Sequence, residues 1–330
     1  MRVGLWSLAH MHAYSYLSSL REREDVELMG LTDEEGERGA RAAAERGIPF
    51  YPDPDTLLSR VDAVIITSAN ADHRAMAERA AGAGVSVLLE KPIATTYEDG
   101  RAIVEAFARA GRTLAIAFPC PFSPAFQELL AAVHSGRLGR LLAMRTTNRG
   151  SMPGGFFIQL ERSGGGAVID HTVHVADLLR RLTRAEPTRV YAEVGHGLYH
   201  QEWDDSGLLS IDMSDGSVAT LDCSWSRPKS YPIWGDVTLH VIGESGTADA
   251  DLFGQHLHLY PAEEGRPRWL GWGSNLDALM IDDFVAAVRQ GRPPRSTGED
   301  GLRALEVALA AYASAREGRA VAIEEVRRRM

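Results

Sequence analysis

The sequence predicts an α/β protein: an N-terminal, doubly wound parallel sheet of the Rossmann type, followed by an α+β domain with a large open, mostly antiparallel sheet. Apolar runs alternate with amphipathic stretches over the first 120 residues. After about residue 186, strand-like runs follow one another with no helix between them. The chain has 330 residues and is 45% hydrophobic, which is enough for two domains. We place the boundary between 1–120 and 121–330.

The first domain is predicted from its strand–helix alternation. The run VDAVIITS at 61–68 is almost wholly apolar, as is typical of a strand buried on both faces. Because helices separate such runs, the strands should be parallel. Strands are expected at 2–8, 26–33, 61–68, 85–90 and 113–118, with helices from the first strand to about 23 and at 34–46, 72–83 and 97–110.

The second domain is predicted from consecutive strands. Asp215-Gly216 lies between two of them and is a hairpin signal, because glycine tolerates the positive φ of a tight turn. Helices are expected at 124–134, 167–182, 276–289 and 301–316, and strands at 141–148, 189–195, 207–213, 217–225, 237–243 and 256–260.

Composition excludes several classes of function. A net charge of −10 argues against nucleic acid and anionic membranes as partners. No uncharged apolar run reaches the roughly 20 residues of a membrane span. Two cysteines, Cys120 and Cys223, cannot form a disulfide framework, so we expect a cytoplasmic protein. Only Lys91 and Lys229 are lysines, which singles out Lys91 as a position where arginine does not substitute.

The turn after the first strand is where a dinucleotide fold carries its glycines. Here Ser7, Ala9 and His12 hold those positions, a poor match taken alone. Asp33 ends the second strand, where a carboxylate can bind the ribose hydroxyls of NAD and would repel the 2′-phosphate of NADP. A helix cap is the compatible structural alternative for Asp33.

Two further motifs could carry chemistry. Lys91-Pro92 follows a predicted parallel strand, at the edge where ligands bind, and the lysine could stabilise a developing oxyanion. Three glycines at 164–166 precede a helix on which Asp170, His174 and Asp177 are spaced i, i+4 and i+7. An Asp–His pair on one face can orient a substrate and remove a proton. A solvated face or a satisfied buried histidine is the structural alternative.

Together these motifs resemble the Gfo/Idh/MocA family of NAD(P)-dependent oxidoreductases, which act mainly on sugars, inositols and their derivatives. The resemblance runs from residue 3 to about residue 321, and its most specific parts are Glu90-Lys91-Pro92 and the glycine run with Asp170, His174 and Asp177. Asn70 and His73 match the family's T-P-N-x-x-H segment. The segment 118–122, FPCPF, lacks the polar residues that members often have there.

The resemblance implies a hydride transfer between NAD and a polyol, sugar or inositol-like hydroxyl compound, by a dinucleotide-binding domain and a substrate-binding domain. NADP is disfavoured and no metal is expected. Implied catalytic residues are Lys91, Asp170 and His174. Cofactor contacts are expected from Ser7, Leu8, Ala9, Asp33, Thr67, Ser68, Asn70, His73, Glu90 and Lys91. Substrate contacts are expected from His12, Lys91, Asn148, Arg149, Asp170, His171 and His174, with His10 a further candidate.

Other readings remain open. The same fold can serve as a non-catalytic ligand sensor or as a glycosidase that uses NAD. A metal-dependent hydrolase would use His10-Met11-His12 as a ligand pair, but the fold of such enzymes alternates strands and helices throughout. The expected partners are a small-molecule substrate and further copies of the chain, as a homodimer or homotetramer formed through the C-terminal sheet.

Overall fold

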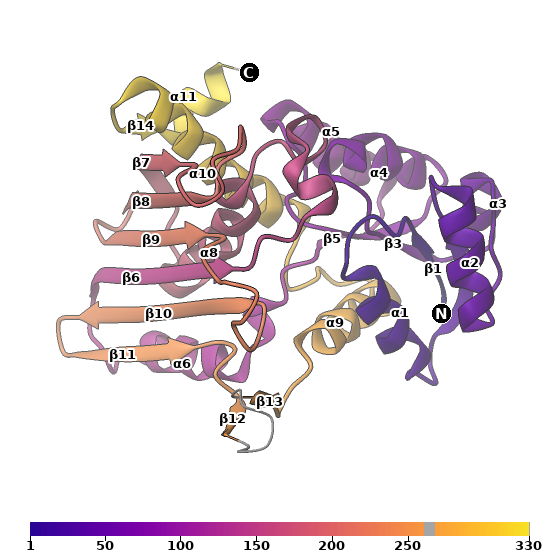
Figure 1. The fold of residues 1–330 in the computed structure, drawn as a ribbon, viewed down its shortest axis with the longest axis horizontal. Helices are drawn as coiled ribbons and strands as arrows, with labels where there is room; N and C mark the ends of the chain where they lie inside the picture. Colours follow the sequence, from indigo (N-terminus) through magenta and orange to yellow (C-terminus); the bar gives the residue numbers. More distant parts are fainter. Residues whose placement is uncertain (261–267, 330) are drawn as a thin grey trace. The chain divides into compact units, whose positions relative to one another are not determined.

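A computed structural model describes residues 1–260 and 268–329. The chain forms two compact units, each assembled from separate segments (Figure 1). The first contains Met1–Pro119, Gly155–Gly164 and Asp277–Leu302, and the second contains the rest. A single cut at residue 120 therefore leaves out two later segments that pack with the N-terminal part.

The sheet of the first unit is parallel, with the order β2-β1-β3-β4-β5, as predicted for a Rossmann-type domain. Its strands are almost wholly apolar and buried, because helices cover a parallel sheet on both faces. The chain builds outward from β1 in both directions, so the carboxyl ends of β1 and β3 form the point where such folds bind ligands. The strands are β1 (Arg2–Trp6), β2 (Glu27–Thr32), β3 (Ala63–Ile66), β4 (Ser86–Leu89) and β5 (Leu114–Ile116).

The helices of the first unit begin and end where local chemistry predicts. Thr96 caps α5 by accepting the N–H of Asp99, and Gly47 and Gly111 end α2 and α5 in the left-handed conformation. The helices are α1 (Ala13–Arg21), α2 (Gly36–Arg46), α3 (Pro54–Leu58), α4 (His73–Gly82), α5 (Tyr97–Ala110), α7 (Leu160–Ser163) and α9 (Leu276–Gln290), with 3-10 turns η1 (Asn70–Asp72) and η3 (Gly155–Ile158).

The second unit is built on a seven-stranded sheet with the order β11-β10-β6-β9-β8-β7-β14 (Figure 1). Every neighbouring pair is antiparallel except β6 and β9, and Gly216 makes the predicted β8–β9 turn with φ 85°. The strands are β6 (Leu141–Gly150), β7 (Pro187–Gly195), β8 (Ser206–Met213), β9 (Val218–Ser224), β10 (Gly235–Gly243), β11 (Gly246–Asp251) and β14 (Val321–Ala322).

Helix α8 (Ala167–Thr183) packs against β6, β8 and β9 on one face of this sheet. The other face is open: burial alternates along β8, and Leu208 is 63% exposed. The remaining helical elements are η2 (Cys120–Phe122), α6 (Pro124–His134), α10 (Gly298–Glu317) and α11 (Ile323–Arg328). No helix among the described residues is long and apolar enough to cross a membrane.

The predicted fold class is confirmed, with local corrections. The strand expected at 256–260 lies outside the large sheet and forms a separate hairpin of β12 (His256–Leu259) with β13 (Arg268–Gly271). Strand β11 was not predicted because its sequence, GTADAD, carries almost no hydrophobic signal. Helix α10 begins at Gly298 rather than at 301.

Candidate active site

The turn after β1 begins at Ser7, which adopts a backbone conformation typical of glycine. Ser7 lies at φ 80°, in the left-handed region that glycine normally fills. The strained residue is fixed from two sides: its N–H donates to the carbonyl of Thr32, and its hydroxyl oxygen accepts the N–H of Ala9. The first fingerprint position is therefore left-handed although its residue is a serine and not a glycine.

Asp33 follows β2, and its buried carboxylate organises this turn. It accepts the main-chain N–H groups of Leu8 at 2.6 Å and Glu35 at 2.7 Å. The Arg38 guanidinium lies 2.9 Å away as its counter-charge. Binding the ribose of NAD and capping a helix, the two roles predicted for Asp33, would both use this carboxylate. In the structure, main-chain N–H groups and Arg38 already bind it.

Helix α1 presents an N-terminus suited to an anion. Its N-cap residue, His12, makes no side-chain capping bond, and its first turn contains no acidic residue. The carboxylates near this helix start, those of Asp277 and Glu90, come from distant parts of the chain and accept the hydroxyls of Ser15 and Tyr16. Together with the β1/β3 position, a first turn without acidic residues matches the site at which the fold binds a dinucleotide diphosphate.

Four predicted cofactor residues follow β3. Thr67 donates its hydroxyl to the carbonyl of Ser7 at 2.6 Å and accepts the N–H of His10, so it ties the turn to β3. Asn70 donates its amide to the carbonyl of Ser163 at 2.8 Å. His73, fully buried, lies with Nδ1 2.9 Å from the carbonyl of Pro92, and it therefore anchors the segment after β4. Ser68 is buried beside them.

Glu90 is the centre of a buried polar cluster. Its Oε1 accepts the Tyr16 hydroxyl at 2.7 Å and lies 3.0 Å from His12 Nδ1, and its Oε2 accepts the Lys91 N–H at 3.1 Å. Burial alone would raise the pKa of Glu90, but its interactions with His10, His12 and Lys91 outweigh burial and hold the pKa far below its usual range. Burial opposes protonation of His12, but Glu90 outweighs it and raises that pKa.

Lys91 is the second residue after β4, close to the strand end where it was predicted, and is 5% exposed. Its Nζ is 5.8 Å from the ring centre of Phe157, which stacks on Phe156. The His10 ring packs edge-on against Phe157, at 5.1 Å between ring centres. The ammonium therefore lies beside an aromatic wall in the first unit, at the carboxyl edge of the sheet.

The glycine run before α8 is required by close packing. Gly164 lies at φ 80°. A Cβ on Gly165 would come within 2.1 Å of the Tyr312 hydroxyl, and one on Gly166 within 1.9 Å of the carbonyl oxygen of Asp204. Those two partners cap the helix: Asp204 accepts the N–H groups of Gly166 and Val168, and the Tyr312 oxygen accepts the N–H of Ile169.

Asp170 and His171 are adjacent on α8 and contact each other. Trp225 donates its indole N–H to Asp170 Oδ2 at 3.2 Å, and His171 Nε2 lies 3.3 Å from the same oxygen. His171 Nδ1 is 2.8 Å from the carbonyl of Asn148, whose amide donates back to the carbonyl of His171. A carbonyl only accepts, so Nδ1 carries a proton. The Nε2 contact is then attractive only if a second proton lies between His171 and Asp170.

The remaining residues singled out in the second unit are His174, Asp177 and Arg149. His174 lies one turn after Asp170 on α8 and is buried. Asp177 is engaged by Arg181 through two bonds of 2.8 and 2.9 Å. Arg149 points to the opposite face of the sheet from Asn148, where it pairs with Asp236 and Asp222. The structure therefore does not bring Arg149 together with Asp170 and His171.

The predicted site residues fall into two groups, one in each unit. The first unit brings together Ser7, Leu8, Ala9, Asp33, Thr67, Ser68, Asn70, His73, Glu90, Lys91 and His12 around the carboxyl ends of its strands. The second brings together Asn148, Asp170, His171 and His174 around α8. Sequence reasoning missed Tyr16, Trp225, Asp204 and Tyr312, which act through contacts distant in the chain.

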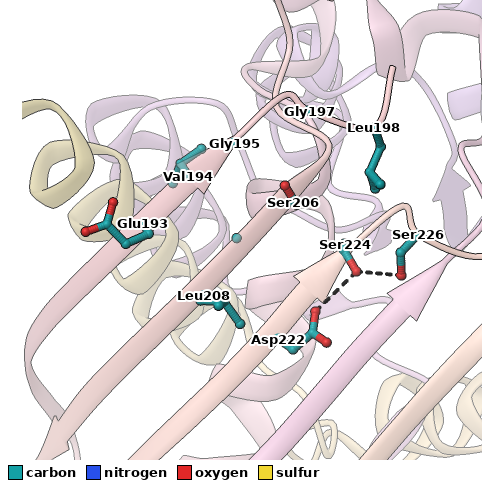
Figure 2. A pocket seen from close by; sticks show the side chains of 11 residues that line it. Glu193, Val194, Gly195, Gly197, Leu198, Ser206, Leu208, Asp222, Ser224 and Ser226 are labelled. Atoms are coloured by element: carbon teal, nitrogen blue, oxygen red, sulfur yellow. Dashed lines mark hydrogen bonds between the residues drawn. The ribbon is translucent and has the colours of Figure 1, made fainter. Parts of the chain in front are cut away.

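A hollow on the open face of the second unit contains none of the predicted site residues (Figure 2). Asp222, Ser224 and Ser226 line one side of it through a chain of hydrogen bonds of 3.2 and 2.9 Å. Leu208 and Leu198 line it as well. This hollow belongs to the exposed sheet face rather than to the α8 side.

Two protein families match two successive parts of the chain. Residues 3–118 match the family described as "Oxidoreductase family, NAD-binding Rossmann fold". Residues 126–249 match the "GFO/IDH/MocA C-terminal domain".

Characterised proteins match over nearly the whole chain. D-apiose dehydrogenase of Paraburkholderia graminis is 29% identical, covering 98% of this chain and 88% of its own length. Myo-inositol 2-dehydrogenase of Thermotoga maritima is 28% identical, covering 98% of each chain. The crystal structure of GenD2 from gentamicin A biosynthesis, in complex with NAD, is 26% identical with a TM-score of 0.88 and covers 98% of this chain and 96% of its own.

Proposed function

Because the chain belongs to the Gfo/Idh/MocA family of oxidoreductases with an NAD-binding Rossmann domain, we propose that it oxidises or reduces a secondary hydroxyl group of a polyol, sugar or inositol-like compound. The observation that carries the proposal is Lys91 at the carboxyl edge of the parallel sheet, together with Asp170 and His174 on one helix. The relatives named above support the substrate class, since their names specify dehydrogenases of apiose and inositol.

Bound nicotinamide supplies or accepts the hydride. His174 would remove the hydroxyl proton in the oxidative direction and return it in the reverse direction. Lys91 would donate hydrogen bonds to the substrate oxygen and stabilise the charge that develops there. Its position beside Phe157 limits the access of water to the ammonium. Asp170, oriented by Trp225 and His171, would fix the substrate for this transfer.

The structure bears differently on the four remaining residues predicted to contact the substrate, which are His12, Asn148, Arg149 and His171. His12 is partly exposed and lies beside Glu90. Asn148 and His171 bind each other's main chain, so we propose that they support Asp170 rather than touch the substrate. Arg149 is held by two carboxylates on the other sheet face, and we no longer propose it as a contact.

We propose NAD rather than NADP as the preferred cofactor. Asp33 is followed in the chain by Glu34, Glu35 and Glu37. The residue at the end of β2 is where such folds contact the adenosine ribose, so these carboxylates support a site that disfavours a 2′-phosphate. Arg38, the cation within reach of Asp33, is already bound to Asp33 and Glu35. The ribose hydroxyls of NAD would gain hydrogen bonds there, whereas a 2′-phosphate would meet a net negative charge.

Titration calorimetry with NAD, NADH and NADP tests the cofactor proposal, after removal of carried-over nucleotide. We expect NAD to bind at least about tenfold more tightly than NADP. A preference for NADP would contradict the role given to Asp33. No binding of any nucleotide would favour a ligand sensor with the same fold.

A screen of polyols, sugars and inositols with NAD tests the reaction. In an active pair, Lys91→Met and His174→Asn should each lower kcat by about 10²-fold or more. NAD binding should persist in His174→Asn, which separates a catalytic loss from a loss of fold. Near-normal turnover in either variant would remove that residue from the mechanism. A product released by bond cleavage without net NADH formation would indicate a glycosidase that uses NAD.

We also propose that the open face of the second sheet pairs with a second copy of the chain. Apolar side chains that monomers usually bury are exposed there, among them Leu208 and Val218, which are 63% and 44% exposed. Light scattering after size-exclusion chromatography tests this, and Leu208→Asp should shift a dimer or tetramer toward the monomer. We further propose a cytoplasmic location, because Cys120 and Cys223 are buried and neither forms a disulfide.

A further inference from the structure

The proposed hydride transfer assigns no chemical step to His10 or His12, the two histidines of the first turn. His10, His12 and Glu90 each offer one ligand atom, and these atoms lie within 4.8 Å of one another. Glu90 Oε1 is 3.0 Å from His12 Nδ1 and 3.6 Å from His10 Nδ1. Glu90 and His10 are 0% and 1% exposed, so this is an interior cluster rather than a chance group of surface charges.

The spacing matches the edges of a tetrahedral metal site. Nitrogen and oxygen ligands of zinc lie at about 2.0–2.1 Å from the metal, which places two tetrahedral ligands about 3.3–3.4 Å apart. The two measured separations lie on either side of this value. A hydrogen bond explains the shorter separation but not the longer one.

His10 is placed to serve as the third ligand. Its Nδ1 accepts the main-chain N–H of His12 at 3.2 Å, through the lone pair with which an imidazole also binds a metal ion. The same nitrogen lies 3.6 Å from the Glu90 oxygen. A metal ion between the two atoms would bond to both, at the loss of one weak contact.

The surroundings of Glu90 are those of a supported metal ligand. The Tyr16 hydroxyl and the Lys91 N–H each donate to its carboxylate, which fixes the orientation of the group. The His12 side chain is 33% exposed, so the cluster is open on one side. An ion could enter there, and a further ligand could complete its coordination.

We propose that His10, His12 and Glu90 bind a divalent first-row transition metal ion, with Zn²⁺ as the best match. Two imidazole nitrogens and one carboxylate oxygen are ligands that suit zinc, and three protein ligands leave one position open. The ion would join the turn after β1 to the end of β4, directly before Lys91. Binding requires neither nucleotide nor substrate, so the proposal stands apart from the dehydrogenase function. It replaces the sequence expectation of no metal.

Zinc titration of the untagged full chain tests the proposal, after treatment with EDTA and removal of the chelator. Competition with a chromophoric chelator gives stoichiometry and affinity. We expect one zinc ion per chain, with affinity reduced at least about tenfold in Glu90→Gln and in His12→Gln. Substitution with Co²⁺ should give the intense visible absorption of a tetrahedral site, and both variants should lose it.

His196→Gln is the matched control, because this exposed histidine lies in the second unit. It should leave both zinc affinity and the Co²⁺ spectrum unchanged. The partly exposed His12 keeps the test valid if the buried Glu90 variant does not fold. Zinc binding that is absent in the wild-type chain, or unchanged in His12→Gln, would overturn the proposal. Neither result depends on whether NAD binds or any substrate turns over.

Discussion

The Tyr312 hydroxyl donates a hydrogen bond to Asp204 Oδ1 at 2.8 Å, and the two side chains together cap helix α8. Asp204 receives the N–H groups of Gly166 and Val168, and the Tyr312 oxygen lies 3.2 Å from the nitrogens of Gly166 and Ile169. Unpaired N–H groups at a buried helix start are costly. The pair therefore satisfies the first turn of the helix that carries Asp170 and His174.

Tyr312→Phe should destabilise the protein by about 1–3 kcal/mol, the usual cost of leaving buried polar groups without partners. The ring volume is unchanged, so the loss reports the hydroxyl alone. Urea unfolding followed by circular dichroism measures it. Tyr191→Phe is the control: Tyr191 is exposed and bonded only to Glu193 among its described contacts, so its loss should be near zero. Equal stability of the two variants would contradict the capping role.

Gly166→Ala should be more damaging than the loss of the Tyr312 hydroxyl. The added Cβ would lie 1.9 Å from the carbonyl oxygen of Asp204, a main-chain atom that cannot rotate away. The start of α8 or the Asp204 segment must shift, at an expected cost of several kcal/mol, within the range of severe packing changes. Thermal unfolding checks this.

Gly36→Ala provides the comparison for that variant. Gly36 also lies at the start of a helix, but a Cβ there would meet nothing within 4 Å. Its stability should change by less than about 1 kcal/mol, and in the favourable direction. A Gly166→Ala protein as stable as Gly36→Ala would show that close packing does not explain the glycine run.

The glycine run shows how far the sequence could predict the site. Its position before a helix was readable, but its reason was not, because Asp204 and Tyr312 lie 38 and 146 residues further along the chain. Arg149 was a different kind of miss. Neighbouring residues on a strand point to opposite faces, so Asn148 and Arg149 could not both face α8. Only the pairing of β6 with its neighbours decides which one does.

The first unit was predictable because its signals are local. Each buried strand is a short apolar run. Asp33 directly follows β2, and Lys91 is the second residue after β4. The left-handed Ser7 and the Glu90 cluster could not be predicted in the same way. The conformation of Ser7 depends on its hydrogen bond to the carbonyl of Thr32. The cluster joins Glu90 to Tyr16 and His12, which are 74 and 78 positions away in the sequence.

His171→Leu should lower kcat by about tenfold to 10²-fold if Asp170 orients the substrate, because small displacements at a reacting centre cost that much. Leucine removes the imidazole whose Nε2 lies 3.3 Å from Asp170 and leaves the carboxylate held by Trp225. His171→Gln keeps an N–H donor near the Nε2 position and should recover part of the rate. Steady-state kinetics with the substrate from the screen measure both. Equal rates in the leucine and glutamine variants would exclude the orienting role.

His73 should make the protein less stable below about pH 6.5. Burial is the main cause of its lowered pKa, and Glu90 and the main-chain carbonyls of Pro92 and Ile93 offset it only in part. Between its lowered pKa in the folded protein and the ordinary histidine pKa of 6.5, the unfolded chain binds a proton that the folded chain does not. Stability therefore falls as pH decreases through this window. His73→Asn keeps a donor near Nδ1 for the Pro92 carbonyl but does not titrate.

The measurement is urea unfolding at pH 7.5 and pH 5.5 in the presence of EDTA. The wild-type chain should lose up to about 1.4 kcal/mol more stability between these values than His73→Asn, which is one pKa unit of linkage. His196→Asn, at an exposed position, should keep the wild-type dependence. If His73→Asn also kept it, another group would be responsible for the acid sensitivity, and His73 would contribute only its bond to Pro92.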